Sequence, residues 1–382
     1  MSDAPKPYRA TRGRRLIVAG GGTGGHLFPG IAVAQLFLTR HPRNRVLFIN
    51  AGRPLEVNVL ARLGWPHATI PVEGLKGRGL WRQLNALAKI PGALRQSRAL
   101  IQDFEPDGVL GVGGYSAGPV VLAAWMLGVP TALHEQNRLP GLTNRLLRRV
   151  VDRIYLTFAD DTHRFDPRKA LVTGNPVRDE ILALGAKPKP SADPATFHLL
   201  ILGGSQGARA INEAMVAALP RLADCPRLQV VHQTGLEDEP TVARAYARAG
   251  IAATVQAFFN DMAEQYHRAH LIVCRAGATT VAEITAVGRA ALFIPFPHAA
   301  DDHQTGNARA LVEAGAAEMV AQRDLNGDLL AERILDFINQ RQRLAEMAAR
   351  ALTLGRPEAA LNIVNDLYQL MERSRADAPE TP

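Results

Sequence analysis

Cysteines are scarce in this chain of 382 residues, and it has no long apolar run. The two cysteines, Cys225 and Cys274, lie far apart and outside any metal-binding spacing, which excludes a disulfide-stapled secreted domain and indicates a reduced, cytosolic compartment. The apolar stretch 117–133 carries no charge, but it is shorter than the ~20 residues of a membrane span and is interrupted by prolines and a glycine. We therefore expect a buried helix followed by a buried strand there.

The motifs of metal, signal-peptide and nucleic-acid-binding segments are also missing. No Asp-x-Asp pair and no histidine cluster with metal-ligand spacing occurs, so we expect no catalytic metal and no cofactor. The apolar run after residues 1–15 is too short for a signal peptide, and we interpret this basic segment as a disordered tail. Without arginine-rich repeats or finger spacing, the net charge of +8 favours phosphorylated substrates or anionic lipid over nucleic acid.

The chain does contain two series of short apolar strands that alternate with helical patterns, which is typical of parallel sheets covered by helices. A proline-rich gap at 187–194 separates the two series. We predict an α/β fold of two facing, Rossmann-like, doubly wound parallel-sheet domains with a ligand cleft between them. The expected strands are 16–19, 45–49, 68–72, 108–112, 131–133, 153–156 and 171–173, then 198–202, 229–232, 253–256, 271–274 and 291–294.

The same pattern gives the expected domain organisation. An N-terminal domain covers 16–176 and a C-terminal domain covers 177–355. A helix at 356–373 is expected to pack back on the N-terminal domain, and 374–382 forms a polar tail.

The first expected strand leads into a glycine-rich turn, 20–26 (GGGTGGH), that opens a helix. A helix start aims backbone N–H groups and a positive helix end at an anion, and glycines let the backbone approach a phosphate closely. His26, at the rim of this turn, can exchange a proton near neutral pH.

The spacing of Gly20, Gly22 and Gly25 also fits a dinucleotide-binding turn, although alone that signal is weak. A nicotinamide or flavin enzyme would carry an acidic residue after the second strand, where this chain has Asn50. This counts against an oxidoreductase without excluding it.

Two further turns have the same strand-turn-helix form. Residues 203–209 (GGSQGAR) offer backbone N–H groups and the Ser205 hydroxyl to a phosphate. In residues 274–283 the carboxylate of Glu283, expected in the first helical turn, can bind both hydroxyls of a ribose. It can equally cap the helix in a capping box with Thr280, and the spacing leaves both readings open.

Polar turns follow three other strands, at 113–116, 134–137 and 300–304. They belong to the carboxyl ends of parallel strands, where open α/β sheets bind ligands. Separately, the stretch 75–100 interleaves apolar and basic residues. It fits either a segment that lies on an anionic membrane or a solvated surface helix, and composition alone favours the helix.

Together these motifs resemble those of the bacterial enzymes that add N-acetylglucosamine to undecaprenyl-pyrophosphoryl-muramoyl-pentapeptide, the lipid-linked peptidoglycan precursor. The matching stretches span nearly the whole chain in the family's order. They are 21–29 (GGTGGHLFP), 113–118 (GGYSAG), 134–137 with 140–141 (HEQN and PG), 174–178 (GNPVR), 203–209 (GGSQGAR), 276–283 (AGATTVAE) and 302–307 (DHQTGN).

The resemblance implies a GT-B fold and an inverting transfer from UDP-N-acetylglucosamine, with the donor mainly on the second domain. It implies that Glu283 binds the ribose, that Phe259 and its neighbour Phe258 lie along the uracil, and that Ser205 holds the pyrophosphate. His26 matches the family's proposed catalytic histidine, and Gly113, Gly114 and Tyr115 would face the lipid acceptor. The implied donor contacts are Thr23, Gly24, Gly25, Asn137, Arg178, Ser205, Phe259, Ala278, Thr279, Thr280, Val281, Ala282, Glu283 and Gln304.

A lipid-linked acceptor further implies a peripheral protein on the cytoplasmic face of the inner membrane, in contact with anionic lipid through 75–100. Three other functions stay open. They are a GT-B transferase with another acceptor, a non-catalytic nucleotide-sugar-binding protein and, third, a dinucleotide oxidoreductase.

Overall fold

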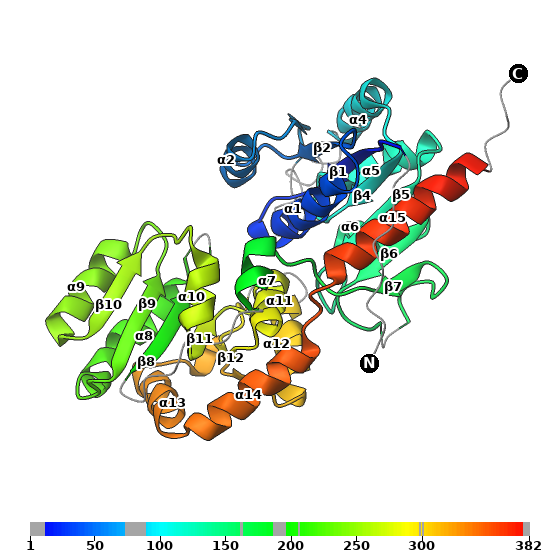
Figure 1. Cartoon of the computed structure of the whole chain (residues 1–382). Helices are drawn as coiled ribbons and strands as arrows, with labels where there is room; N and C mark the ends of the chain where they lie inside the picture. The colour runs from blue at the N-terminus through cyan, green and yellow to red at the C-terminus, as the bar shows by residue number, and fades with distance from the viewer. Residues whose placement is uncertain are drawn as a thin grey trace, which may run out of the picture. The chain divides into compact units, whose positions relative to one another are not determined.

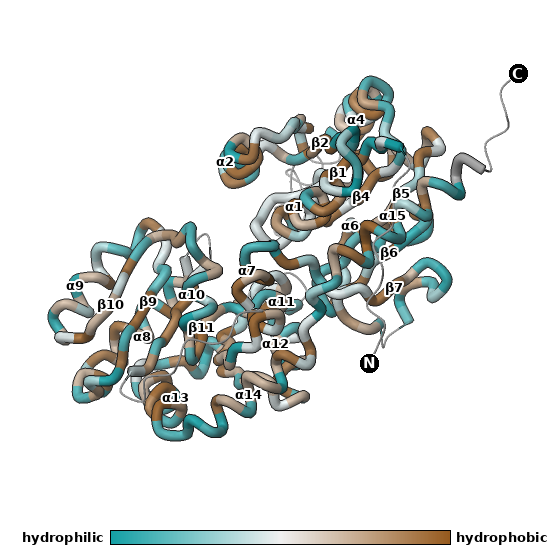
Figure 2. The backbone as a smooth tube through the Cα atoms, viewed as in Figure 1, coloured by the Kyte–Doolittle hydropathy of each residue, from teal (hydrophilic) through white to brown (hydrophobic). Residues whose placement is uncertain are grey.

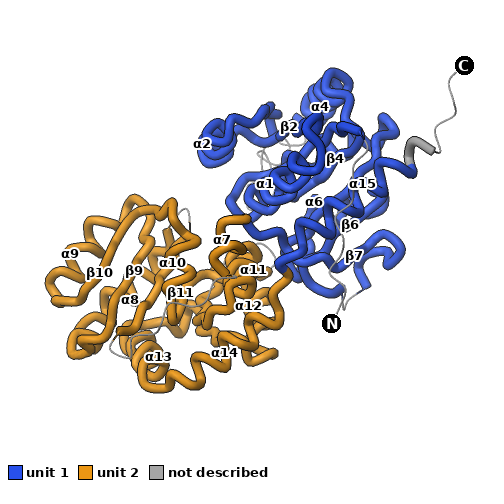
Figure 3. Tube along the Cα trace, viewed as in Figure 1, with its two compact units in different colours: residues 1–178, 357–382 blue, residues 179–356 orange. Residues whose placement is uncertain are grey.

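The chain folds into two compact units, and this computed structural model describes residues 12–72, 89–160, 163–185, 196–204, 207–297, 299 and 302–376. Unit 1 comprises Met1–Arg178 and Pro357–Pro382, and unit 2 comprises Asp179–Arg356 (Figure 3). Several sequence predictions lie wholly or largely outside the described residues: the N-terminal tail, the first part of the basic stretch 75–100, the proline-rich gap, Ser205 and the end of the C-terminal tail.

Unit 1 contains a seven-stranded sheet in which every neighbouring pair is parallel (Figure 1). The strand order is β3-β2-β1-β4-β5-β6-β7. The strands are β1 (Arg15–Ala19), β2 (Arg45–Asn50), β3 (His67–Thr69), β4 (Gly108–Gly111), β5 (Thr131–Glu135), β6 (Arg153–Leu156) and β7 (Ala170–Val172).

Helices cover both faces of this sheet because its central strands are apolar on both sides. Leu16 and Val18 of β1 pack with α1 and α15, whereas Ile17 and Ala19 pack with α4 and α5 on the other face. The expected buried helix and strand within 117–133 are confirmed as α5 and β5. The helices are α1 (Gly24–Thr39), α2 (Pro54–Arg62), α4 (Ile90–Phe104), α5 (Ala117–Met126), α6 (Leu142–Leu147) and α15 (Ala359–Ala376).

The last helix, α15, belongs to unit 1 although it follows unit 2 in the sequence, and Figure 1 shows it alongside α1. Asp366 accepts hydrogen bonds from Arg153 at 3.1 Å and from the buried hydroxyl of Tyr155 at 2.9 Å. The ring of Tyr368 stacks on Phe37 of α1 with centroids 5.3 Å apart. These contacts make α15 part of the core of unit 1.

Unit 2 contains a six-stranded parallel sheet in the order β10-β9-β8-β11-β12-β13. Its strands are β8 (Phe197–Leu202), β9 (Leu228–Gln233), β10 (Ala252–Gln256), β11 (Leu271–Cys274), β12 (Ala290–Phe293) and β13 (Glu318–Met319). Its helices are α7 (Asp179–Gly185), α8 (Arg209–Leu222), α9 (Glu239–Ala249), α10 (Met262–Arg268), α11 (Ala278–Val287), α12 (His303–Glu313), α13 (Gly327–Asn339) and α14 (Arg341–Leu354).

The largest apolar core of unit 2 forms where α8 and α13 pack on one face of the sheet, against Leu199 and Ile201 of β8 and Val273 of β11. The apolar strands and inward-facing helix residues appear as brown segments of the tube in Figure 2.

Each sheet reverses its strand order once, between β1 and β4 in unit 1 and between β8 and β11 in unit 2. At such a switch point the loops after the two central strands diverge to opposite faces and leave room for a ligand at the carboxyl ends of the strands. The glycine-rich turns that follow β1, β4, β8 and β11 all lie at these two switch points.

Candidate active site

The turn after β1 is held by the protein's own hydrogen-bond acceptors. Gly20, Gly21 and Gly22 have φ angles of +131°, +142° and +95°, which favour glycine. Their N–H groups donate to the Ile49 carbonyl at 3.0 Å, to the Gly113 carbonyl at 3.2 Å and to the Glu56 carboxylate, respectively. An anion at this turn would therefore be contacted at the residues that follow, Thr23, Gly24 and Gly25, where α1 begins.

The turn after β4 packs directly against the turn after β1. Gly113 and Gly114 also have positive φ angles, +92° and +82°. A Cβ atom on Gly114 would overlap the Gly21 carbonyl oxygen, and one on Gly113 would lie 2.8 Å from Nδ1 of His26. The absence of side chains lets these two turns meet backbone to backbone beside His26. Tyr115, which follows them, is half-buried.

Glu56 is a buried acid in this region that the sequence analysis did not single out. One carboxylate oxygen accepts the N–H of Gly22, and the other accepts the N–H of Arg53 at 2.7 Å. The Arg53 guanidinium returns a hydrogen bond of 2.8 Å to the Gly22 carbonyl. In the sequence, Glu56 stands two residues after Pro54, as a glutamate in the first turn of a helix does. This position indicates a helix cap but does not indicate the contact with Gly22.

A chain of polar side chains runs from His26 into the loop after β5. Nδ1 of His26 lies 3.1 Å from Oε1 of Gln136, and Nε2 of Gln136 lies 3.1 Å from Nδ1 of His134. Nε2 of His134 in turn lies 3.4 Å from the Gly174 carbonyl oxygen. Burial lowers the pKa of His134 to about 4, so its ring is neutral at physiological pH.

The neighbouring Glu135 shapes the loop that carries Asn137. Its carboxylate accepts the Asn137 and Gly141 N–H groups, both at 3.0 Å, and the Asn144 side-chain amide at 2.8 Å. Burial raises the pKa of this carboxyl, and the three donors oppose that rise. Arg178, also in unit 1, places its guanidinium 4.7 Å from the ring centre of Phe28, two residues after His26. Unit 1 thus places the turns after β1 and β4 and the loop after β5 in contact around His26, with Arg178 beside Phe28 of α1.

In unit 2, the turn after β8 is fixed by the buried side chain of Gln233. Its Nε2 donates to the Gly204 carbonyl at 3.0 Å, and its Oε1 accepts the Phe259 N–H at 3.2 Å. The Phe259 side chain is 3% exposed, whereas that of Phe258 is 44% exposed. Of these two rings only that of Phe258 is exposed, while Phe259 is buried and its backbone N–H is the group bonded to Gln233.

The turn after β11 bears on the two roles predicted for Glu283, a ribose ligand and a helix cap. Helix α11 begins at Ala278 with the extended Gly277 as its N-cap, and Val281 N–H donates to the Gly277 carbonyl at 2.9 Å. Glu283 is therefore the sixth helical residue, so the capping box with Thr280 is wrong. Because a glycine provides the cap, no side-chain cap bond forms at this helix. The Glu283 carboxylate instead accepts a hydrogen bond of 2.9 Å from Tyr266.

Helix α12 contacts the loops after β11 and β12. Oε1 of Gln304 accepts the Phe296 N–H at 2.9 Å, which ties α12 to the loop after β12. Asn307, which the sequence analysis quoted only as part of a motif, is fully buried and donates to the Ala276 carbonyl at 3.2 Å. Thr279 and Ala278 are buried at the start of α11, while Thr280 and Ala282 are half-buried.

Comparison with known proteins assigns the family. Residues 16–156 match the glycosyltransferase family 28 N-terminal domain, and residues 198–363 match its C-terminal domain. The chain is 50% identical over 360 residues to the UDP-N-acetylglucosamine--N-acetylmuramyl-(pentapeptide) pyrophosphoryl-undecaprenol N-acetylglucosamine transferase of Syntrophus aciditrophicus (strain SB), which covers 94% of this chain and 99% of that relative.

This chain belongs to glycosyltransferase family 28.

Solved structures agree with the family assignment. The crystal structure of Acinetobacter baumannii MurG superposes with a TM-score of 0.74 at 33% identity, covering 93% of this chain and 99% of that one. A UDP-GlcNAc 2-epimerase from Neisseria meningitidis, at 16% identity and a TM-score of 0.66, shares the fold alone. The fold class predicted from the sequence, GT-B with doubly wound parallel sheets, is confirmed, and the family makes the chain a glycosyltransferase.

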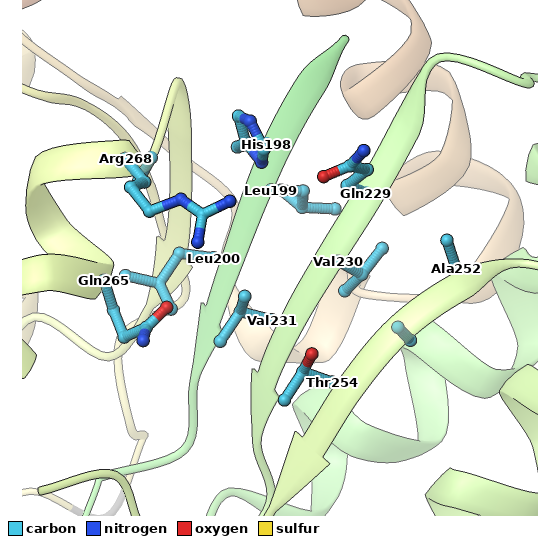
Figure 4. Close-up of a pocket in the computed structure, with 12 residues that line it drawn as sticks. His198, Leu199, Leu200, Gln229, Val230, Val231, Ala252, Thr254, Gln265 and Arg268 are labelled. Atoms are coloured by element: carbon cyan, nitrogen blue, oxygen red, sulfur yellow. The ribbon is translucent and has the colours of Figure 1, made fainter. Parts of the chain in front are cut away.

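A cavity of about 390 Å³ in this family 28 chain lies away from the glycine-rich turns. Figure 4 shows His198, Gln229, Thr254, Gln265 and Arg268 around an apolar floor that includes Leu200 and Val231. The strand residues that line it come from the first four residues of β8, β9 and β10, whereas the turns of the switch point follow the last residues of the strands. The cavity is therefore separate from the candidate site.

Two properties of the described residues bear on the family's chemistry. No group of three or more His, Cys, Asp or Glu side chains among them is placed to hold a metal ion. Within the same ranges, no helix has both the length and the apolar character needed to cross a membrane.

Proposed function

We propose that this chain transfers N-acetylglucosamine from UDP-N-acetylglucosamine to undecaprenyl-pyrophosphoryl-N-acetylmuramoyl-pentapeptide, with inversion, in peptidoglycan biosynthesis. The observation that carries this proposal is the likeness of 94% of the chain to a transferase whose name states that activity. The family assignment supports a UDP-sugar transferase in general, and the named relative supports the particular donor and acceptor.

The donor nucleotide binds at the switch point of unit 2 in this proposal. Glu283, buried and held by Tyr266, accepts both ribose hydroxyls. The backbone of Phe259 and the exposed ring of Phe258 hold the base. The start of α11 offers its first N–H groups to the diphosphate, because a helix N-terminus favours negative charge. The residues assigned to the donor are Ser205, Phe259, Ala278, Thr279, Thr280, Val281, Ala282, Glu283 and Gln304, with Thr23, Gly24, Gly25, Asn137 and Arg178 of unit 1.

The chemistry requires a base and a stabilised leaving group. An acceptor hydroxyl loses its proton as its oxygen bonds to the anomeric carbon, and the bond to UDP breaks with the electron pair left on the diphosphate. His26 takes the proton in this proposal, and Arg178 with the helix N-termini stabilises the departing charge. The Gly113 to Tyr115 turn contacts the pyrophosphate of the acceptor. No step is assigned to a metal ion or a cofactor.

Transfer of radiolabelled sugar to a soluble analogue of the lipid-linked acceptor tests this function. Wild-type chain should transfer sugar from UDP-N-acetylglucosamine and much less from UDP-glucose. His26→Ala should lower turnover by about 10²–10⁴-fold while the donor still binds. Near-normal turnover of His26→Ala would end the base assignment alone. Donor binding without any transfer by the wild-type chain would indicate a nucleotide-sugar-binding protein instead.

The lipid-linked acceptor also requires contact with a membrane. In this proposal the chain is peripheral at the cytoplasmic face of the inner membrane and binds anionic lipid. Helix α5, which packs on α4 in unit 1, supports this, because Trp125 and Met126 at its C-terminal end are 47% and 56% exposed.

A further inference from the structure

The side-chain amide of Gln136 can take only one orientation in its buried position. Gln136 is 1% exposed and follows β5. Its Nε2 lies 2.8 Å from the carbonyl oxygen of Val112, which can only accept a hydrogen bond. If the amide were flipped, two oxygens would face each other at this buried site. The NH₂ group therefore faces Val112, and Oε1 faces the other way.

His134 fixes the same orientation, because it accepts a hydrogen bond from the second hydrogen of the Gln136 NH₂ group. Nε2 of His134 lies 3.4 Å from the Gly174 carbonyl oxygen, which places a proton on Nε2 and leaves the lone pair on Nδ1. That lone pair accepts from Gln136 at 3.1 Å. A neutral His134 is needed for this arrangement, and burial lowers its pKa to about 4. Both hydrogens of the amide are thereby committed to fixed acceptors.

The fixed amide determines which nitrogen of His26 carries the proton. Oε1 of Gln136 lies 3.1 Å from Nδ1 of His26, and a carbonyl oxygen can only accept. Nδ1 must therefore carry hydrogen, so that in the neutral ring the lone pair lies on Nε2. Histidine in water prefers the opposite tautomer, with hydrogen on Nε2, so the protein reverses the ordinary preference.

We propose that Gln136 is a positioning residue that holds His26 in its Nδ1–H tautomer and thereby makes Nε2 the proton-accepting atom of the transfer. The tautomer follows from contacts within unit 1, whereas its use in transfer rests on the proposed function. In the step itself the acceptor hydroxyl gives its proton to Nε2 as its oxygen bonds to the anomeric carbon. The resulting imidazolium keeps its Nδ1–H bond to Gln136, and the electron pair of the broken bond leaves with UDP.

The backbone at Gly113 packs closely against the side chains of His26 and Gln136. A Cβ atom there would lie 2.8 Å from Nδ1 of His26 and 3.5 Å from Oε1 of Gln136. The hydrogen bond between the two side chains is therefore covered by backbone that has no room for a side chain. Such packing shields this side of the hydrogen bond from water.

Nitrogen NMR of the intact wild-type chain tests the tautomer without any assay of activity. With ¹⁵N-labelled histidine at alkaline pH, the two ring nitrogens of neutral imidazole give separate protonated and unprotonated signals, and His26→Gln identifies the signals of His26. We expect a protonated Nδ1 and an unprotonated Nε2. A protonated Nε2 in the wild-type chain would overturn the proposal, whatever the variants do.

Replacing the amide tests the positioning role. Gln136→Met removes both donors and the acceptor at similar length. We expect His26 to shift toward the Nε2–H tautomer and kcat to fall by about 10-fold or more, with the KM for UDP-N-acetylglucosamine within about 2-fold of wild type. Gln342→Met is the control for loss of a glutamine amide, because this exposed glutamine of α14 donates to the Glu346 carboxylate at 3.1 Å and lies in unit 2, whereas His26 lies in unit 1. It should change neither the spectrum nor kcat.

The outcomes separate this inference from the proposed function. If Gln136→Met keeps both the wild-type tautomer and the wild-type kcat, Gln136 does not position His26, and the transferase function stands. If His26→Ala retains turnover, His26 is not the base, and the tautomer finding stands as a structural property. Should Gln136→Met fail to fold, the wild-type spectrum still tests the proposal, because a protonated Nε2 of His26 would overturn it.

Discussion

The hydroxyl of Tyr266 donates a hydrogen bond of 2.9 Å to Oε2 of Glu283, and both side chains are buried in unit 2. A carboxylate loses much of its hydration on burial, so a fixed donor both stabilises its charge and sets the direction of its remaining lone pairs. Tyr266 lies on α10 and Glu283 on α11, so two helices together orient the group that the proposed function assigns to the ribose.

The donor affinity should respond to each partner of this pair. Glu283→Gln removes the charge and one acceptor, and we expect the KM for UDP-N-acetylglucosamine to rise about 10-fold or more. Tyr266→Phe leaves the carboxylate in place but less constrained, so a smaller rise of a few-fold is expected. Steady-state kinetics with varied donor measure both.

Tyr246→Phe is the matched control for Tyr266→Phe. Tyr246 is equally buried in unit 2, but its hydroxyl contacts Nδ1 of His232 at 3.1 Å instead of a candidate site residue. The control should unfold at lower urea concentration than wild type and keep its KM. An equal rise in KM for both tyrosine variants would show that loss of packing, and not the bond to Glu283, sets donor affinity.

Local sequence patterns identified the turns of the candidate site but not the contacts that hold these turns in place. The glycine-rich turns after β1, β8 and β11 were found because strand, turn and helix are consecutive in the chain. Glu56 was missed, and Gln136 was quoted only within the turn 134–137, because their partners Gly22 and His26 lie 34 and 110 residues away. Contacts between residues so far apart in the sequence can be inferred only once the order of the strands in the sheet is known.

The start of α11 shows a different limit. Thr280 and Glu283 have the spacing of a capping box, and the local sequence gave no reason to prefer Gly277 as the cap. The helix begins earlier because β11 ends at Cys274 and the extended Gly277 already turns the chain into α11. Tertiary placement of the strand therefore overrode a valid local signal. The two-residue strand β13 was also missed, since so short a segment has no periodicity to detect.

A methyl group at Gly113 should disturb the candidate base directly. Gly113→Ala imposes the cost of a positive φ and places Cβ 2.8 Å from Nδ1 of His26. We expect kcat to fall on the order of 100-fold, because a displacement near 1 Å at a catalytic group has effects of that size.

Gly128→Ala is the control that separates the backbone strain of a positive φ from the displacement of His26. Gly128 also has a positive φ, +70°, but a Cβ there would meet no described atom within 4 Å. This control should lose a similar amount of stability, measured by urea unfolding, and keep its kcat. The idea that Gly113 is required beside His26 fails if the two variants have the same kcat.

Acid should destabilise unit 2 through His232. This histidine is buried between Tyr246 and Asn212, and burial lowers its pKa from 6.5 to about 3. Between these values the unfolded chain binds a proton that the native state does not bind. Stability is therefore fully present above pH 6.5 and is lost as the pH falls, at up to about 1.4 kcal/mol per pH unit for this one group.

Urea unfolding as a function of pH checks this prediction. His232→Gln retains a donor and an acceptor but has no titrating ring. Its unfolding free energy at neutral pH should be lower than that of wild type, and its dependence on pH between about 6 and 4 should be shallower. Parallel pH dependences for the two proteins would mean that His232 becomes protonated without unfolding.

Vesicle binding should depend on exposed residues of α4 and α5 in unit 1. Trp125 and Met126 expose apolar surface at the end of α5, and α4 carries the exposed residues Arg95 and Arg98. Each basic residue near an anionic surface contributes about 1 kcal/mol, so Arg95→Gln with Arg98→Gln should weaken binding to phosphatidylglycerol vesicles roughly 30-fold at low salt. Binding of the wild-type chain should weaken as salt is added, because salt screens this attraction.

Arg244→Gln with Arg248→Gln is the control. It removes the same charge from exposed positions of α9 in unit 2 and should have little effect on vesicle binding. Sedimentation with vesicles measures all three proteins, and absence of wild-type binding at low salt, or equal losses in both double variants, would count against a membrane surface on α4 and α5.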